Sequence, residues 1–280
     1  TTAMHFRTHT SEKNSGKSGQ GFYNDAMVHH DENIGRMLDK IDELGLAEDT
    51  IVMYSTDNGP HYNTWPDAGI TPFRGEKNTN WEGGWRVPAF VRWPGKIKAG
   101  SVSNGIVSHQ DWLPTLLAAA GEPDVKEKCL TGHKVGEKTF TCHIDGFNML
   151  PHFKGETESP RHTFFYISDD GDVLAIRHND WKAVLMEQRA STLMCWFEPF
   201  VPLRGPKIFN LRQDPFERAD HGSNTYWDWY ISRAYLIYGM QELVSQEIEN
   251  FIKYPPRQKP ASFNLDAVMR QLEESAHAAT

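Results

Sequence analysis

The spacing of apolar and polar positions predicts a mixed α/β fold in the first 121 residues. From Asp25 to Leu44 apolar residues recur at helical spacing, and Gly45 follows as a stop signal, so we expect an amphipathic helix there. Thr50–Thr56 is a short apolar run followed by turn residues, which is typical of a strand buried on both faces of a parallel sheet. A second buried strand is predicted at Pro88–Arg92, and a helix at Asp111–Ala120.

After Gly121 the pattern changes to shorter elements. Glu122–Lys138 is polar and is predicted to be a loop. Three short apolar runs separated by turn residues predict an antiparallel meander: Phe164–Ser168, Val173–Arg177 and Trp181–Met186. A long amphipathic helix is expected over Tyr226–Lys253. Two short terminal elements complete the prediction, a strand over residues 1–6 and a helix over residues 263–274.

Polar residues follow directly on the first predicted strand. Asp57 and Asn58 would project a carboxylate and an amide oxygen from the carboxyl end of that strand, where open α/β sheets place their chemistry. Such hard oxygen ligands suit Ca²⁺ or Mg²⁺ better than a soft metal. Asp-Asn-Gly also makes ordinary turns, so the neighbouring motifs decide between the two interpretations.

Four motifs follow one another in a fixed order. They are Asp57-Asn58-Gly59-Pro60, Gly75-Glu76-Lys77, Glu82-Gly83-Gly84-Trp85-Arg86-Val87-Pro88 and Trp93-Pro94-Gly95. In this order they resemble the sulfatase family of the alkaline-phosphatase-like superfamily. Residues 108–117, 145–150 and 209–217 continue the resemblance, which covers most of the chain, although residues 57–95 are its most specific part.

The resemblance implies a fold and a division of the chain. The fold class expected is α/β, the carboxyl-terminal part of an alkaline-phosphatase-like mixed sheet with flanking helices, plus a small antiparallel α+β subdomain. Residues 1–121 would belong to the sulfatase α/β domain. Residues 122–280 would form a linker and the carboxyl-terminal antiparallel-sheet subdomain with its long helix.

The resemblance also assigns roles to residues. Asp57 and Asn58 would be two ligands of a Ca²⁺ ion, with Mg²⁺ as the alternative. Lys77 matches the family's lysine, and its ammonium would hold a sulfate oxygen and offset charge on the leaving oxygen. His5 would donate the proton to the departing alcohol, with His9 as a competing candidate.

Three further residues are predicted to contact the substrate. His61 follows the metal-binding motif and either faces the substrate or caps its loop. Arg74 either touches the substrate or braces the Lys77 loop. Trp65 is the tryptophan predicted to stack on a ring of the substrate. Asp111 is expected to cap its helix.

The family's nucleophile, a formylglycine, is made from the first residue of a Cys- or Ser-x-Pro/Ser-x-Arg motif. None of the three cysteines, Cys129, Cys142 and Cys195, stands in such a motif, and no serine does. We therefore expect the chain to be the carboxyl-terminal portion of a sulfatase, supplying half of the active site. Its partner would be the amino-terminal half, with the formylglycine and further metal ligands. The chain alone is predicted to be inactive.

The expected function is sulfuric ester hydrolysis of the arylsulfatase type, on a small-molecule or saccharide sulfate ester. The alternatives are a phosphate or phosphonate monoester hydrolase and a non-catalytic binding protein. Two-zinc phosphatases usually carry Asp-His, so Asn58 favours the sulfatase. The net charge of -8 argues against a nucleic-acid partner, and no segment approaches the length of a membrane span. Family resemblance favours a periplasmic or secreted location.

Overall fold

The computed structural model describes residues 5, 7–62 and 71–255. Its described strands form three antiparallel sheets. One pairs β1 (Val52–Ser55) with β2 (Ala89–Arg92), and another pairs β3 (His133–Val135) with β4 (Lys138–Phe140). The largest has the order β5-β6-β7-β8, with bounds Thr163–Ile167, Val173–His178, Trp181–Glu187 and Val201–Asn210. The mixed α/β character and the predicted three-stranded meander are confirmed. The structure adds β8 as a fourth strand of that sheet.

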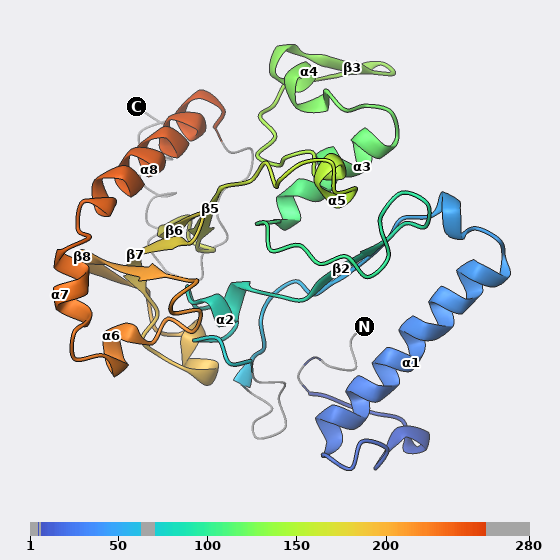
Figure 1. Cartoon of the computed structure of the whole chain (residues 1–280), viewed down its shortest axis with the longest axis horizontal. Coiled ribbons are helices and arrows are strands. Elements are labelled where there is room, and N and C mark those ends of the chain that lie inside the picture. The colour runs from blue at the N-terminus through green and yellow to red at the C-terminus, as the bar shows by residue number, and fades with distance from the viewer. Residues whose placement is uncertain (1–4, 6, 63–70, 256–280) are drawn as a thin grey trace, which may run out of the picture.

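The α-helices lie around these sheets (Figure 1). The helices and their bounds are α1 (Phe22–Glu43), α2 (Glu82–Trp85), α3 (Trp112–Ala119), α4 (Val125–Thr131), α5 (Leu150–Phe153), α6 (Ala219–Gly222), α7 (Tyr226–Ile231) and α8 (Leu236–Lys253). Short 3₁₀ turns occupy Glu12–Asn14, Ala47–Asp49, His109–Asp111 and Thr192–Trp196. The predicted helices at 25–44 and 111–120 are confirmed, the first ending before Gly45, whose φ is 66°.

The strands β1 and β2 are where expected, but their surroundings differ from the prediction. They pair antiparallel, with Val52 opposite Arg92 and Ser55 opposite Ala89. Neither is buried on both faces, since Met53 is 40% exposed and Phe90 66%. The expectation of a parallel, doubly buried strand is therefore wrong for the described residues. An apolar run predicts a strand, but it does not specify which strand pairs with it or what covers it.

The four-stranded sheet has a different partner on each face. Trp81, just before α2, packs against Val184 of β7 and Phe209 of β8 in one cluster of buried side chains. Ala183, next to Val184 in sequence, belongs to a second cluster with Met240 of α8. Adjacent strand residues point to opposite faces, so α8 covers one face and the segment before α2 the other (Figure 1). The segment bearing the sulfatase-like motifs is thus packed on the carboxyl-terminal sheet.

The single helix predicted over Tyr226–Lys253 is wrong, because the chain forms α7 and α8 with turns between them. The carbonyl oxygen of Trp229 accepts from the hydroxyl of Ser232 at 2.8 Å and from Nη1 of Arg233 at 3.3 Å. The backbone N–H of Arg233 instead donates to Tyr230 at 3.0 Å, one residue short of helical spacing. Side chains that compete for a helical carbonyl explain the break without glycine or proline.

The prediction of a loop over 122–138 is also wrong. Residues 125–131 form α4, and Gly132, with φ at 108°, turns the chain into the β3–β4 hairpin. The lysines and glutamates of this segment made it look polar throughout. Val125 and Cys129 are nevertheless buried, one helical turn apart on the same face of α4.

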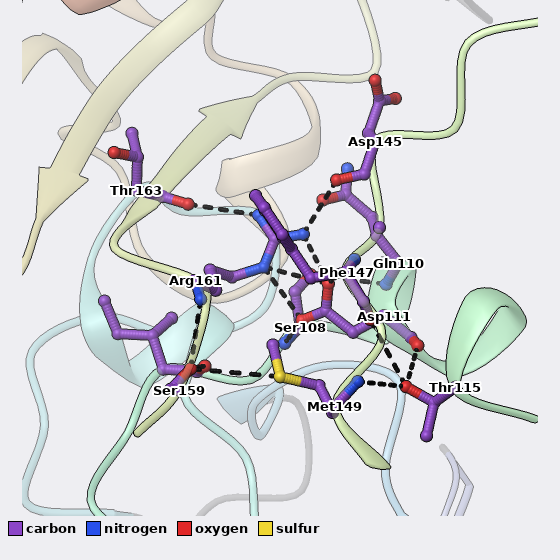
Figure 2. A network of polar contacts seen from close by, with 12 residues as sticks. Ser108, Gln110, Asp111, Thr115, Asp145, Phe147, Met149, Ser159, Arg161 and Thr163 are labelled. Atoms are coloured by element: carbon purple, nitrogen blue, oxygen red, sulfur yellow. Dashed lines mark hydrogen bonds and ion pairs between the residues drawn. The ribbon is translucent and has the colours of Figure 1, made fainter. Parts of the chain in front are cut away.

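A buried ion pair connects α3 to the start of the four-stranded sheet (Figure 2). Arg161 donates from Nη2 to Asp111 Oδ1 at 2.6 Å and from Nε to Oδ2 at 2.9 Å. The same carboxylate accepts the backbone N–H groups of Ser108 and Phe147, both at 2.8 Å. The expectation that Asp111 caps the helix that follows it is wrong, because at the N-cap of α3 its side chain makes no capping bond. Its carboxylate instead completes a capping box with Ser108 around the preceding 3₁₀ turn, and it neutralises Arg161.

Some expectations fall outside the described residues. The strand predicted over residues 1–6 does so apart from His5, and so do the helix predicted over 263–274 and Trp65. Of the helices in the described ranges, even the long α1 and α8 lack the apolar stretch that crossing a bilayer would require.

Candidate functional site

The site begins where β1 ends. Asp57 is exposed, and its Oδ1 accepts the backbone N–H of Asn58 at 3.1 Å and the hydroxyl of Thr56 at 3.2 Å. Asn58 is partly buried and donates its side-chain amide to the carbonyl of Gly59 at 2.8 Å. These local bonds fix both side chains at the strand end.

The segment after Asp57 is packed directly against the later glycine motif. Gly59 donates its N–H to the carbonyl of Gly84 at 2.9 Å. A Cβ at Gly59 would overlap the carbonyl oxygen of Gly83, so a side chain there would force the two segments apart. The sequence analysis placed the two motifs in order along the chain. The direct contact between them is what the structure adds.

Lys77 stands on a tight turn in this contact. Its backbone N–H donates to the carbonyl of Pro60 at 2.8 Å, which ties the lysine to the segment that carries Asp57. The next residue, Asn78, has a positive φ of 65°, an uncommon conformation for a residue with a side chain. Glu76 is 1% exposed and accepts the N–H of Tyr62 at 2.8 Å, which joins the turn to the segment after β1.

His61 lies beside Lys77 and receives a partner that the sequence analysis did not predict. The indole N–H of Trp196, from the loop between β7 and β8, donates to His61 Nε2 at 3.1 Å. The Trp196 ring also faces Lys77, whose Nζ is 5.7 Å from the ring centroid. Burial lowers the pKa of His61, Glu76 opposes this, and the nearby charges of Lys77 and His5 lower it further.

The structure therefore brings His61 and Lys77 together close to the strand end that carries Asp57 and Asn58. His5 is exposed and close enough for its charge to act on His61. The competing His9 is exposed, and its Nδ1 lies 3.5 Å from the carbonyl oxygen of Arg7.

Arg74 points toward the carboxyl-terminal part of the chain. Its guanidinium pairs with Asp220 at 3.0 Å, donates to the carbonyl of Glu217 at 2.9 Å and lies 3.5 Å from the centroid of the Trp81 ring. These contacts favour the bracing role over the substrate-binding role, the two alternatives that the sequence left open.

A buried charged cluster supports the Gly-Gly motif from the carboxyl-terminal sheet. Lys182 of β7, fully buried, lies 3.2 Å from Glu82 and 2.7 Å from Glu217. Burial alone would raise the pKa of Glu82, but Lys182, the Tyr166 hydroxyl and Arg177 together lower it. Burial and the nearby Glu82 raise the pKa of Glu217 despite Lys182. The cluster holds α2 in place, so Glu82 has a structural role beside the glycines of the motif.

A cavity of about 500 Å³ opens behind the lysine turn. Its lining residues include Tyr62, Arg74 and Glu76 from the motif segment, and Arg189 and Lys207 from β7–β8. The cations along it are paired, Arg189 with Glu187 at 2.9 Å and Lys207 with Glu187 at 2.8 Å. The cavity therefore has little unbalanced charge with which to hold an anion.

The donors at the strand end fit part of a hard-cation site. Asp57 and Asn58 supply one charged and one neutral oxygen, whereas Ca²⁺ takes about six to eight oxygen ligands. Within residues 5, 7–62 and 71–255, no group of three or more histidine, cysteine, aspartate or glutamate side chains could hold a metal ion. A complete site needs ligands besides these two.

The sequence analysis missed the residues that support the site from a distance in the chain. Trp196 and Lys182 come more than a hundred residues after Lys77. One signal was visible for Trp196, because it lies in the uncharged run of residues 190–197, whose apolar side chains include exposed Leu193, Met194 and Phe197. An apolar run that leaves its side chains exposed commonly marks a binding surface.

Comparison with known proteins gives consistent results. A sequence model of the family described as Sulfatase matches residues 5–122. Mouse (Mus musculus) steryl-sulfatase is 32% identical over 226 residues, which cover 73% of this chain and 34% of that protein. Human (Homo sapiens) arylsulfatase A is 30% identical over 231 residues, which cover 76% of this chain and 41% of that protein.

A solved structure gives the same picture. The crystal structure of the PsFucS1 sulfatase from Pseudoalteromonas sp. superposes with a TM-score of 0.71 at 27% identity, covering 89% of this chain and 46% of that chain. The fold and the motif arrangement thus define a protein of the alkaline-phosphatase-like class. The chain belongs to the sulfatase family. It spans less than half the length of each of these three relatives.

Proposed function

We propose that the protein carrying this chain hydrolyses sulfate esters, with Asp57, Asn58 and Lys77 forming part of the active site. The observation that supports this most is the bond from the Lys77 N–H to the carbonyl of Pro60 at 2.8 Å. It holds a cationic side chain beside the oxygen ligands at the end of β1. A site that cleaves a sulfate ester needs both, because charge develops on the sulfate oxygens and on the leaving oxygen.

Each residue has a definite task in this proposal. Lys77 holds a sulfate oxygen and offsets charge on the leaving oxygen. His5 donates a proton to that leaving oxygen, a role that suits an imidazole near neutral pH. His61 contacts the substrate beside Lys77, as a neutral ring whose lowered pKa keeps it from adding a further positive charge.

Asp57 and Asn58 would hold Ca²⁺, with Mg²⁺ as the alternative, together with ligands outside this chain. When bound, the cation supplies positive charge that polarises a sulfate oxygen. The nucleophile, a formylglycine by family resemblance, would also come from outside residues 1–280.

For the substrate we propose a small-molecule or saccharide sulfate ester. One relative is named N-acetylgalactosamine-6-sulfatase, from Canis lupus familiaris, and it is 32% identical over 183 residues, which cover 65% of this chain and 32% of that protein. Its name supports a sulfated sugar among the substrates to be tried first.

The test compares a chromogenic aryl sulfate with the matching phosphate ester, using the full-length protein. Turnover of the sulfate should fall by about 10²–10³ in Lys77→Ala, the usual effect of removing one charge-stabilising group. Lys98→Ala, an exposed lysine outside the motifs, should keep full activity. Preferential turnover of the phosphate would favour the phosphatase alternative. Binding of both esters without turnover would favour a non-catalytic protein.

A second assay addresses the division of the site. Residues 1–280 expressed alone should not turn over the sulfate, because they contain no formylglycine motif and only two oxygen ligands at the strand end. Activity of this chain alone above that of its Lys77→Ala variant would overturn the split-site proposal.

A further inference from the structure

The loop between β7 and β8 bonds to the lysine turn through Glu76 and Asn78, and to the segment after β1 through His61. The N–H of Thr192 donates to Glu76 Oε1 at 2.6 Å, and the side-chain amide of Asn78 donates to the carbonyl of Cys195 at 2.6 Å. The bond to His61 comes from Trp196. Since Glu76 and Asn78 flank Lys77 in sequence, the loop is fixed relative to the lysine on both sides.

The backbone of this loop is held in a strained conformation. Thr192 has φ at 59°, which is a genuine outlier for a β-branched residue. Such strain persists only where surrounding contacts enforce it, and the bond to Glu76 is one of them. Within the same loop, Gln188 donates to the carbonyl of Glu198 at 2.7 Å and the buried Cys195 thiol donates to the carbonyl of Ala190 at 3.3 Å. The position of Trp196 is therefore set before any substrate arrives.

The bond between Trp196 and His61 determines which ring nitrogen of His61 carries the proton. An indole N–H only donates, so His61 Nε2 must be the acceptor and must carry a lone pair. The ring proton of His61 then resides on Nδ1, and the ring is neutral. The charged and titratable groups around this ring are Glu76, Lys77 and His5. Protonation of Nε2 would break the bond and place a cation beside Lys77.

We propose that Trp196 is a positioning residue that holds His61 neutral, with its Nδ1–H available to donate to the substrate. Only the kinetic test of this role rests on the proposed sulfate-ester hydrolysis. The His61 titration does not depend on it. In this arrangement Trp196 bonds to His61 and its ring faces Lys77, so that the loop between β7 and β8 takes part in substrate recognition.

The test uses two substitutions in the full-length protein. Trp196→Phe keeps an aromatic face but loses the N–H, and Trp196→Ala loses both. In Trp196→Phe the pKa of His61, followed by NMR with His61→Gln for assignment, should rise, because the lost bond stabilised the neutral ring. KM for the sulfate ester should rise about three- to tenfold, the range expected for one hydrogen bond, with a smaller change in kcat. Trp227→Phe, an exposed tryptophan on α7, is the matched control.

The outcomes separate this inference from the proposed function. An unchanged His61 titration in Trp196→Phe would overturn the positioning role whatever the protein's activity. If Trp196→Phe shifted the His61 titration but had the same KM and kcat as the control Trp227→Phe, the role in substrate recognition would be overturned. If the wild-type protein turned over no sulfate ester, the proposed function would fail, but the titration would still test the Trp196–His61 bond.

A separate observation concerns two cysteines remote from this site. Cys142 donates its backbone N–H to the carbonyl of Cys129 at 3.0 Å, which brings the end of the β3–β4 hairpin against α4. Burial and the adjacent thiol of Cys142 raise the pKa of Cys129. Cys129 is 5% exposed, whereas Cys142 is only partly buried.

We infer that Cys129 and Cys142 form a disulfide when a low-molecular-weight disulfide is present. The accessible Cys142 thiolate attacks that disulfide, forming a mixed disulfide and releasing one thiol. The thiolate of Cys129 then attacks the Cys142 sulfur and releases the second thiol, so that the small disulfide is reduced as the protein pair is oxidised. Export to the periplasm or the cell exterior, the expected location, would supply such oxidants.

Peptide mass mapping after incubation with oxidised glutathione tests this. The wild-type protein should give a Cys129–Cys142 linked peptide that dithiothreitol separates, while the buried Cys195, whose pKa burial raises to about 11, stays reduced. Cys129→Ser should stop at a glutathione adduct on Cys142. A wild-type protein that accumulates this adduct with Cys129 still alkylatable would overturn the inference.

Discussion

Asp57 and Asn58 stand next to each other at the end of β1 but offer different oxygens. The carboxylate attracts a dication through its full charge, the amide only through its dipole. In the full-length protein, Asp57→Ala should therefore lower bound Ca²⁺ more than Asn58→Ala does, with hydrolysis falling in parallel. Elemental analysis of the purified variants measures this, with Asp39→Ala on exposed α1 as the control. Stoichiometric zinc, or unchanged activity in Asp57→Ala, would contradict the calcium assignment.

At this scale the sequence predicted which candidate residues lie close together where they share a motif. Asp57, Asn58, His61 and Lys77 lie within one continuous stretch, and a fixed spacing carries over into space because the intervening turns are short. Trp196 could not be predicted in the same way. Its contact with His61 depends on how the β7–β8 loop packs on the lysine turn, and no local pattern encodes that packing.

At the scale of single elements, the ion pair of Arg161 with Asp111 gives the clearest prediction. The side chains of Arg161 and Asp111 are 5% and 1% exposed, so Asp111→Ala would leave a buried guanidinium without its counter-charge. Loss of one partner of a buried pair typically reduces the free energy of unfolding by about 3–5 kcal/mol.

Urea unfolding measures this loss, and the chain offers a matched control. Asp42 pairs with Arg92 at 2.6 Å, but the two side chains are 52% and 36% exposed. Asp42→Ala should therefore change the free energy of unfolding by about 0–1 kcal/mol. Equal effects of the two substitutions would show that burial of the Arg161 pair does not matter for stability.

Most helices and strands could be predicted from periodicity, but their pairing and continuity could not. β1 and β2 were located correctly, yet their antiparallel partnership depends on contacts between residues far apart in sequence. The break between α7 and α8 arises from Ser232 and Arg233 competing for one carbonyl. Neither glycine nor proline stands at this point, so periodicity alone predicted one continuous helix.

At the scale of the whole molecule, Lys182 joins the motif segment to the carboxyl-terminal sheet. Replacing it by methionine would leave Glu82 and Glu217 buried without their shared cation, so their pKa values should rise in the folded state. The variant should be destabilised by about 3–5 kcal/mol near neutral pH. As the pH falls, its folded state takes up protons that the wild type does not, so the difference in stability should narrow.

Urea unfolding of Lys182→Met from pH 7 to pH 4 tests this, and adding Glu217→Gln should restore part of the lost stability. A deficit that widens toward acid would contradict the assignment of Lys182 as the counter-charge. The sequence could not predict this cluster, because a lysine in an amphipathic strand is normally expected to face solvent.

The close contact between the segment after β1 and the glycine motif has a consequence for hydrogen exchange. The amides of Gly59 and Lys77 lie outside every described helix and strand, yet each donates across that contact, to Gly84 and Pro60. These two amide protons should exchange with deuterium only when the two segments separate. Both should therefore exchange slowly and at the same rate. The amide of Gly100, in an exposed turn, should exchange at once. A shared slow rate at Gly59 and Lys77 would mark the end of β1 and the lysine turn as one cooperative unit.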